Sequence, residues 1–167
     1  AIFNYLFAKK NNGKFLLRIE DTDKERSKQE YTEGIIESLK WLGLEYDDFS
    51  VQSQNMPAHK EAMQKLITEG KAYISKEEAK DGSGVIKEIV RFKNPNKSVT
   101  FKDLILGDIT QDTTDLGDFV IGRNIEDPLY HLAVVVDDMN SNITHVIRGM
   151  DHISNTPRQV LLIEALG

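Results

Sequence analysis

The stretch that most constrains this chain is residues 15–26, in which a short apolar run leads directly into a group of acids. Phe15–Leu17 has the length and composition of a buried strand. The three carboxylates and the threonine at residues 20–23 compete for nearby backbone groups and favour a turn or a helix start. We therefore expect a buried strand that delivers Glu20 and its neighbours to its C-terminal end, the edge of an open α/β sheet at which ligands bind.

These clustered acids have two interpretations. Carboxylates this close repel one another unless a cation, an ammonium group or backbone N–H groups compensate them, so they can form a site for a positively charged group. They can equally form a solvated turn whose acids stabilise the start of the next helix. Spacing alone favours the second interpretation.

Composition narrows the class of protein. The chain has 167 residues, no cysteine and a net charge of −6. The absence of cysteine excludes disulfides and thiolate metal sites, and the acidic balance argues against broad, sequence-independent binding to nucleic acid such as DNA. No apolar run approaches the ~20 residues of a membrane span, and no signal-peptide pattern opens the chain. We expect a cytoplasmic protein with no membrane or DNA partner.

Apolar spacing and turn signals predict the remaining elements. Helices are expected at residues 1–10, 27–44, 57–69 and from Ser154 to the end. Strands are expected at residues 72–74, 85–92, 99–101, 107–110, 119–122, 129–138 and 144–148, with a polar loop at 45–56. Ser27 and Glu30 have the spacing of a capping box at the second helix. The run at 129–138 is nearly all apolar in its second half, which is typical of a central parallel strand.

Four segments of the chain, in this order, resemble motifs of the bacterial glutamyl-tRNA synthetases, a class I aminoacyl-tRNA synthetase family. They are Phe15–Asp23, Leu39–Leu44, Tyr130–Asp138 and Thr144–Gln159. The resemblance covers most of residues 1–75 and 129–167 and is weaker between them.

The resemblance implies an α/β fold, a Rossmann-like parallel sheet with flanking helices that is interrupted by a small, mostly β insertion. Residues 1–75 would form the first half of the nucleotide-binding catalytic fold, 76–128 the inserted subdomain that contacts the acceptor arm of tRNA, and 129–167 the second half. The ATP signatures of the family would precede residue 1 and follow residue 167. We therefore expect a catalytic-domain fragment that does not form the adenylate by itself.

In this family, glutamate is activated by ATP to glutamyl-adenylate and then transferred to the 3′ end of tRNA(Glu). Catalysis depends on positioning and on neutralising phosphate charge, so no residue is expected to act as a catalytic acid or base, and Mg²⁺ accompanies ATP as the usual helper. Some members carry a cysteine-ligated zinc, but no zinc is expected here because the chain has no cysteine.

The resemblance also assigns site residues. Glu20 supplies an anion for the ammonium group of glutamate, and Arg148 supplies a bidentate fork for its side-chain carboxylate. The matching positions are Glu20, Tyr130 and Arg148 for glutamate, His152 for the adenine end of ATP, and Asp23 and Arg26 for the 3′ end of tRNA. This assignment requires Glu20 and Arg148 to meet across one crevice.

Plainer roles remain open for the same residues. Tyr130 and His131 can be structural residues with satisfied hydrogen bonds, Arg148 a surface ion-pair partner, and Asp23 and Arg26 charges at a helix start. Basic residues of the insertion can form an RNA-facing edge or ordinary charged strands that discourage aggregation. These residues are Lys87, Arg91, Lys93, Lys97 and Lys102.

Two alternatives to a glutamate–tRNA ligase follow from the sequence. One is a tRNA-modifying enzyme like the glutamyl-Q tRNA(Asp) synthetase, which activates glutamate but lacks an anticodon domain. The other is a non-catalytic binding module that keeps the fold. The run from Ile147 to Thr156 favours the ligase.

Overall fold

The computed structural model describes residues 1–22, 27–78 and 84–167. The chain forms two compact units, of which the first comprises Ala1–Met56 with His145–Ile147 and the second Pro57–Thr144 with Arg148–Gly167. The three-part division at residues 75 and 128 stays a prediction.

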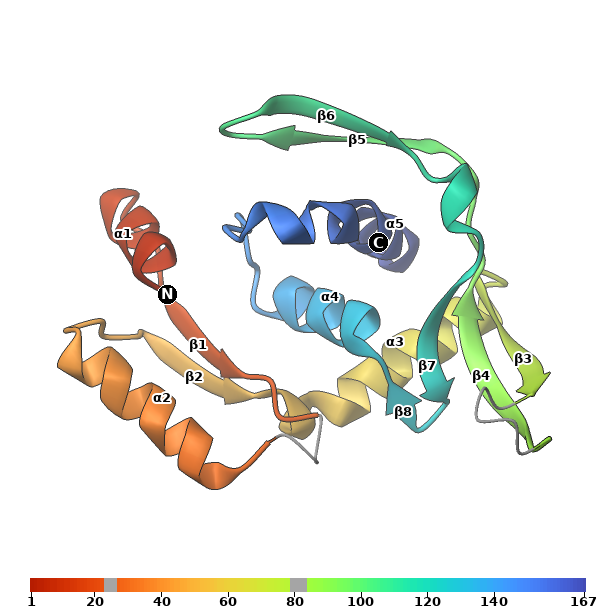
Figure 1. The fold of residues 1–167 in the computed structure, drawn as a ribbon, viewed down its shortest axis with the longest axis horizontal. Coiled ribbons are helices and arrows are strands. Elements are labelled where there is room, and N and C mark those ends of the chain that lie inside the picture. The colour runs from red at the N-terminus through yellow and green to blue at the C-terminus, as the bar shows by residue number, and fades with distance from the viewer. Residues whose placement is uncertain (23–26, 79–83) are drawn as a thin grey trace. The chain divides into compact units, whose positions relative to one another are not determined.

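The first unit contains a two-stranded parallel sheet with two helices. Its elements are α1 (Ile2–Lys10), β1 (Leu16–Ile19), α2 (Gln29–Trp41), β2 (Asp48–Val51) and a short 3₁₀ helix at Gln52–Asn55 (Figure 1). Strand β1 pairs with β2 in parallel, from Leu16 opposite Asp48 to Ile19 opposite Val51. Parallel neighbours need a crossover connection, and α2 supplies it. The two strand ends that follow Ile19 and Val51 therefore lie at the same edge of this sheet.

Helix α2 ends as the sequence predicts but begins differently. Gly43 adopts a φ of +67°, the N–H of Gly43 donates to the carbonyl of Lys40, and the N–H of Leu44 donates to the carbonyl of Leu39. This is a Schellman motif, which glycine favours because it has no Cβ. The predicted capping box is wrong, because the N-cap residue is Lys28 and it makes no side-chain cap hydrogen bond.

Strand β2 lies inside the segment 45–56 that was expected to be a loop. Its sequence, Asp48-Phe49-Ser50-Val51, has no apolar run, and only the last two residues are partly buried. Its pairing with β1 is supported by a contact at the strand entrance, where the backbone N–H of Phe15 donates to Asp47 over 2.8 Å. Pairing with a neighbour, rather than local composition, creates this strand.

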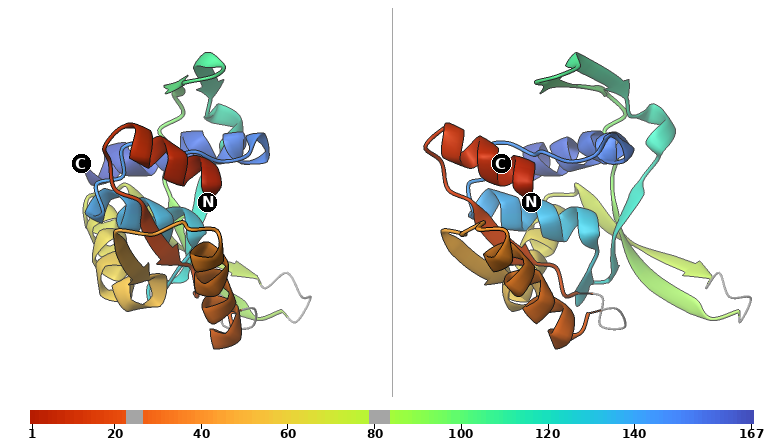
Figure 2. Two further views of the ribbon diagram at one scale, coloured as in Figure 1. Left: turned by 90° about the vertical axis from the view of Figure 1, so that its left-hand side faces the viewer. Right: turned by 60° about the vertical axis from the view of Figure 1, so that its left-hand side comes forward.

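The second unit combines antiparallel strands with three helices. Its helices are α3 (Met56–Thr68), α4 (Tyr130–Asn140) and α5 (Thr156–Leu166), with short 3₁₀ helices at Thr114–Leu116 and Met150–Asn155. Its strands are β3 (Ala72–Glu78), β4 (Ile86–Phe92), β5 (Ser98–Asp103), β6 (Gly107–Asp112), β7 (Phe119–Asn124) and β8 (Asp127–Pro128). One sheet has the order β3-β4-β7-β8, and β5 and β6 form a separate hairpin. Figure 2 shows the hairpins β3–β4 and β5–β6 extending in different directions within this unit.

The core of the second unit joins its helices to β4 and β7. Figure 1 shows α4 and α5 side by side, and they are in contact. The largest fully buried apolar side chains come from α3, β7, α4 and α5, and they are Met63, Leu66, Ile121, Leu132, Leu161 and Leu162. This core fixes the start of α4, which carries the predicted site residue Tyr130, and the start of α5, whose first turn bonds Arg148.

The region after residue 128 corrects two predicted strands. Residues 130–140 form helix α4, and residues 143–149 form no regular element. An apolar run of this length fits a buried helix as well as a buried strand, so its hydrophobicity alone could not distinguish the two. Residues Leu132–Asp137 are all buried, so helix α4 is covered on nearly every side and shows no polar stripe.

The expected α/β class is confirmed. A parallel pair of strands with flanking helices forms in the first unit, and the antiparallel strands of the predicted insertion form in the second.

Candidate functional site

The acids after β1 are partly compensated by the loop after β2. The backbone N–H of Ser53 donates to Oδ1 of Asp21 over 2.8 Å, and the Ser53 hydroxyl donates to Oδ2 over 2.6 Å. The Thr22 hydroxyl bonds Oε1 of the buried Gln52 over 3.3 Å. Asp21 and Thr22 therefore join the ends of the two parallel strands, which supports a structural role for them.

Glu20 remains exposed beside these residues. Arg18, two residues earlier on the same strand, places its guanidinium 3.2 Å from Oε1 of Glu20. The Glu20 side chain keeps 42 % of its surface exposed. A carboxylate held in this way can still accept a hydrogen bond from an ammonium group.

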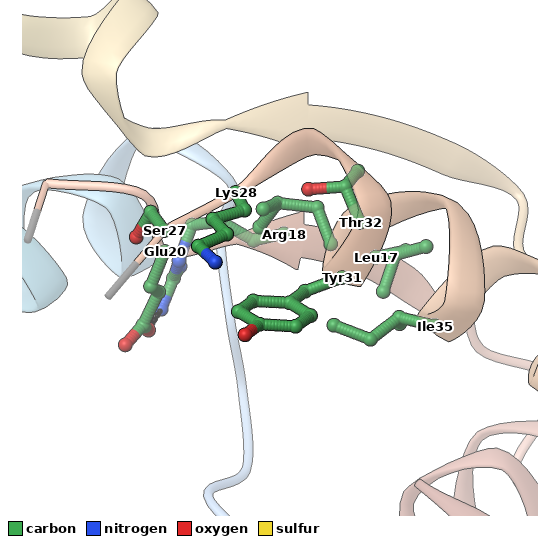
Figure 3. Close-up of a pocket in the computed structure, with 9 residues that line it drawn as sticks. Leu17, Arg18, Glu20, Ser27, Lys28, Tyr31, Thr32 and Ile35 are labelled. Atoms are coloured by element: carbon green, nitrogen blue, oxygen red, sulfur yellow. Dashed lines mark hydrogen bonds and ion pairs between the residues drawn. The ribbon is translucent and has the colours of Figure 1, made fainter. Parts of the chain in front are cut away.

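An open pocket of about 420 Å³ adjoins Glu20 between β1 and α2. Figure 3 shows the Tyr31 ring and Ile35 along one part of this pocket and Glu20 with Ser27 at the other end. Lys28 lies over the Tyr31 ring, with its Nζ 5.7 Å from the ring centroid. The pocket offers an apolar wall next to groups of both charges, a lining that suits a small polar molecule.

Tyr130 and His131 lie at the start of α4 in the second unit. Their ring centroids are 5.3 Å apart, and Tyr130 keeps 44 % of its surface exposed. Tyr130 is therefore not the core residue that the plainer interpretation expected. Its hydroxyl can reach a ligand at the N-terminal end of this helix.

Arg148 is half-buried and is held by the first turn of α5. Its Nη1 donates to Oε1 of Gln159 over 2.8 Å, and its Nη2 donates to Oγ1 of Thr156 over 2.6 Å. Both acceptors are neutral. Within residues 1–22, 27–78 and 84–167, Arg148 forms no ion pair with an acid, so its interpretation as a surface ion-pair partner is not supported.

Positive charge gathers around His131. Burial lowers the pKa of His131, and the nearby charges of Arg158 and Arg148 lower it further. The Arg158 guanidinium also lies over the Phe119 ring, 5.9 Å from its centroid. Two guanidinium groups beside one imidazole make the surroundings of His131 locally electropositive, in a chain whose net charge is negative.

The remaining predicted residues lie apart or outside the described ranges. His152 lies on the 3₁₀ helix Met150–Asn155, with its Nε2 3.5 Å from Asp151 and its Nδ1 3.3 Å from the amide of Asn155. Asp23 and Arg26 fall outside the described residues. Glu20 belongs to the first unit, and Tyr130, Arg148 and His152 belong to the second. The meeting of Glu20 and Arg148 across one crevice stays a prediction.

Sequence reasoning missed the residues that hold Arg148. In the sequence, Thr156 belongs to the start of the last expected helix and Gln159 to the end of the segment Thr144–Gln159, and neither position indicates a contact with Arg148. These residues follow Arg148 by eight and eleven positions. They contact Arg148 only because the 3₁₀ helix between them and Arg148 brings the first turn of α5 close to it.

Sequence reasoning also missed a buried pair between α3 and α4. Nε2 of His59 lies 2.7 Å from Oδ1 of Asp137, and both side chains are at most 1 % exposed. The sequence signal available was an acid at the end of an apolar run and a histidine on the apolar side of a helix.

The basic residues of the predicted insertion mostly stand beside acids. Arg91 bonds Glu77, Lys97 bonds Glu164, Lys87 lies opposite Glu77, and Lys102 lies opposite Asp108 in the strand register. Charges that alternate across neighbouring strands balance one another. The arrangement supports ordinary charged strands, and RNA contact by this surface remains a proposal.

The described residues offer neither a metal-binding cluster nor a membrane-spanning helix. No group of three or more His, Asp or Glu side chains in that part of the chain could hold a metal ion. No helix among the same residues has the length and apolar character needed to cross a membrane.

The chain matches a known protein family. The family described as "tRNA synthetases class I (E and Q), catalytic domain" matches residues 1–84 and 74–167. The two matched segments overlap at residues 74–84, around the start of the predicted insertion, and together cover the chain.

Curated relatives align along the whole chain. The glutamate–tRNA ligase of Aquifex aeolicus (strain VF5) is 48 % identical over 200 positions, which include 100 % of this chain and 42 % of the relative. Glutamate–tRNA ligase 2 of Neorickettsia sennetsu is 47 % identical over 167 positions, which include 100 % of this chain and 38 % of the relative. The longer alignment shows that the Aquifex protein has residues within this region that the present chain lacks.

A solved structure has a similar fold. The crystal structure of a glutamate tRNA ligase from Elizabethkingia meningosepticum in complex with its amino acid superposes with a TM-score of 0.90 at 27 % identity, covering 99 % of this chain and 43 % of that one. The chain spans about two fifths of the length of the relatives it matches. It belongs to the catalytic-domain family of the class I tRNA synthetases for glutamate and glutamine.

Proposed function

We propose that the protein carrying this chain is a glutamate–tRNA ligase, an enzyme that activates glutamate with ATP and transfers it to the 3′ end of tRNA(Glu). The observation that carries the proposal is identity of 48 % along the entire chain to a protein of that name. The site residues agree in chemical type, since an exposed carboxylate and a half-buried guanidinium suit the two ends of glutamate.

Each predicted residue receives a role in this proposal. Glu20 accepts hydrogen bonds from the α-ammonium group of glutamate, and Arg148 donates to its side-chain carboxylate. The exposed Tyr130 hydroxyl donates a third hydrogen bond. Together these contacts hold the α-carboxylate ready to attack the α-phosphate of ATP, and positioning of this kind supplies much of the rate enhancement in bimolecular reactions.

The partners and the remaining residues complete the proposal. His152 contacts the adenine end of ATP, Asp23 and Arg26 approach the 3′ end of the tRNA, and residues 76–128 contact its acceptor arm. Mg²⁺ enters with ATP, because this ion keeps several waters and binds through substrate phosphates with few protein carboxylates. Since tRNA charging serves translation, we propose a cytoplasmic location.

Pyrophosphate exchange with glutamate, ATP and tRNA(Glu) tests this function. We expect exchange that depends on glutamate, and a fall of at least about a hundredfold in kcat/KM for Arg148→Ala, because the substrate carboxylate would lose a charged, bidentate partner. The matched control is Arg123→Ala, which removes an exposed arginine of β7 that pairs with Asp127.

Pyrophosphate exchange together with charging of tRNA(Glu) and tRNA(Asp) separates the alternatives. An enzyme like the glutamyl-Q tRNA(Asp) synthetase would activate glutamate but charge tRNA(Asp) and not tRNA(Glu). A binding module would show no exchange with either tRNA. Equal activity of Arg148→Ala and the unaltered protein would remove the proposed role of Arg148.

A further inference from the structure

Arg148 differs in its partners from three other arginines of known environment, whereas Arg158 likewise bonds a neutral oxygen, the carbonyl of Ser154. Arg18 pairs with Glu20, Arg91 with Glu77, and Arg123 with Asp127. Arg148 instead bonds the amide oxygen of Gln159 and the hydroxyl oxygen of Thr156. Within the described parts of the chain no carboxylate shares its charge.

The two acceptors come from one turn of α5. Thr156 is the first residue of the helix and Gln159 is three residues later, so both side chains lie on the same face. The same helix is anchored by the buried side chains of Pro157, Leu161 and Leu162. The two oxygens are therefore presented to Arg148 from a fixed support rather than from a loop.

Neutral acceptors have a different effect on a guanidinium from a carboxylate. A carboxylate would orient the group but would also cancel its charge and occupy its bidentate face. A hydroxyl and an amide oxygen orient it while the full charge remains available to a ligand. Arginine has five N–H donors, so several remain after these two bonds.

The charge of Arg148 acts on the neighbouring residue His131. Arg148 helps to lower the pKa of the buried His131, and Arg158 acts on His131 in the same direction. The local field therefore favours a negative group beside Arg148. An amide ligand would gain less from this field than a carboxylate of the same shape.

We propose that Thr156 and Gln159 are positioning residues, which orient the Arg148 guanidinium through neutral oxygens and so reserve its charge for the side-chain carboxylate of the substrate. The inference rests on the proposed function, and it explains how the site would select glutamate over glutamine. Neither residue needs to touch the substrate.

The decisive variant is Gln159→Glu in the protein that carries this sequence. It replaces the amide by a carboxylate of the same reach, which pairs with Arg148 and competes with the substrate. We expect the KM for glutamate in pyrophosphate exchange to rise about tenfold or more, while the KM for ATP and the thermal stability stay unchanged. A residue with a merely structural role would show the opposite pattern, with stability and both KM values moving together.

Three further variants complete the test. Gln64→Glu makes the same charge change on the exposed face of α3 and should behave as the unaltered protein. Thr156→Val removes one acceptor without changing side-chain shape and should raise the KM for glutamate several-fold, whereas Thr156→Ser should restore it. The ratio of kcat/KM for glutamate to that for glutamine should fall in Gln159→Glu and Thr156→Val alone.

The outcomes decide between this inference and the proposed function. If Arg148→Ala loses glutamate activation but Gln159→Glu and Thr156→Val keep the KM for glutamate, the positioning role is overturned and the function stands. If Arg148→Ala also keeps both glutamate activation and the KM for glutamate, the proposed glutamate site itself is wrong. Should Gln159→Glu fail to fold, an unchanged KM in Thr156→Val is sufficient to overturn the positioning role.

Discussion

His131 combines burial with nearby positive charge, and this makes the stability of the protein depend on pH. Burial, Arg158 and Arg148 all lower its pKa from the ordinary value of 6.5. When the pH falls through 6.5, the unfolded chain takes up a proton that the folded chain resists. The free energy of unfolding therefore decreases below this pH, until the lower folded-state pKa is also passed.

We predict that the His131→Gln variant loses less stability than the unaltered protein when the pH is lowered from about 7 to about 5.5, because glutamine cannot take up the proton. Urea unfolding at the two pH values measures the difference. His152→Gln is the control, since this residue is exposed. Equal losses in the unaltered protein and His131→Gln would contradict the prediction.

The buried contact between His59 and Asp137 should contribute to the stability of the protein. The 2.7 Å contact joins α3 to α4 in a place that excludes water. His59→Leu would remove the imidazole that bonds the buried Asp137. The free energy of unfolding should therefore fall by about 2 kcal/mol. Asp137→Asn should cost less, because the amide can still accept a hydrogen bond. Chemical denaturation of both variants measures this order, and a reversed order would show that the pair contributes little.

Among the elements, strands β3 and β4 are joined by hydrogen bonds from the side chain of Arg91. Arg91 donates to Oε1 of Glu77 over 2.6 Å, to Oε2 over 3.0 Å, and to the carbonyl of Asp118 over 2.6 Å. A lysine has a single ammonium group and cannot reproduce this fork. We expect Arg91→Lys to lower the free energy of unfolding by about 1 kcal/mol, because the pair is partly exposed and solvent weakens it.

Thermal unfolding checks this expectation, with Arg123→Lys as its control. Arg123 bonds the side chain of Asp127, and its side chain is more exposed than that of Arg91. Its replacement should leave the midpoint within experimental error of the unaltered protein. A larger loss in Arg123→Lys than in Arg91→Lys would show that the contact to the Asp118 carbonyl adds nothing.

The elements also show what local sequence can predict. Gly43 and Gly70, with φ angles of +67° and +69°, end α2 and α3 where turn chemistry placed those ends. Residues 130–140 were expected to form a strand because a continuous apolar run is typical of a central parallel strand, whereas packing among α3, α5 and β7 favours a buried helix. Strand β2 was missed because it exists only through its partner β1. Local signals find ends of elements, and tertiary contacts choose between buried helix and buried strand.

At the scale of the whole molecule, the same limit applies to the candidate site. Glu20 and Arg148 could be named from motifs, because each lies within a segment of characteristic sequence. Thr156 and Gln159 could not be given their role, because their effect depends on how a 3₁₀ helix returns the chain towards Arg148. The motif residues are chemical groups of the expected type, and the residues that orient them are visible only in the fold.

Substrate analogues can test the proposed roles of Glu20 and Arg148 group by group. Glutarate lacks the ammonium group of glutamate, and 2-aminobutyrate lacks its side-chain carboxylate. If Glu20 binds the ammonium group, Glu20→Gln should reduce the preference for glutamate over glutarate to near one while it leaves the preference over 2-aminobutyrate. Arg148→Gln should have the converse effect, because each variant removes the partner of one substrate group only.

Competition by both analogues in pyrophosphate exchange gives the four preferences. Arg123→Gln serves as the control, since it lowers the charge of an exposed position in the second unit. A crossed pattern would mean that the Glu20 carboxylate and the Arg148 guanidinium recognise different groups of glutamate. If either variant changed both preferences equally, the residue would act by maintaining the fold, and recognition of glutamate would have to be sought in other side chains.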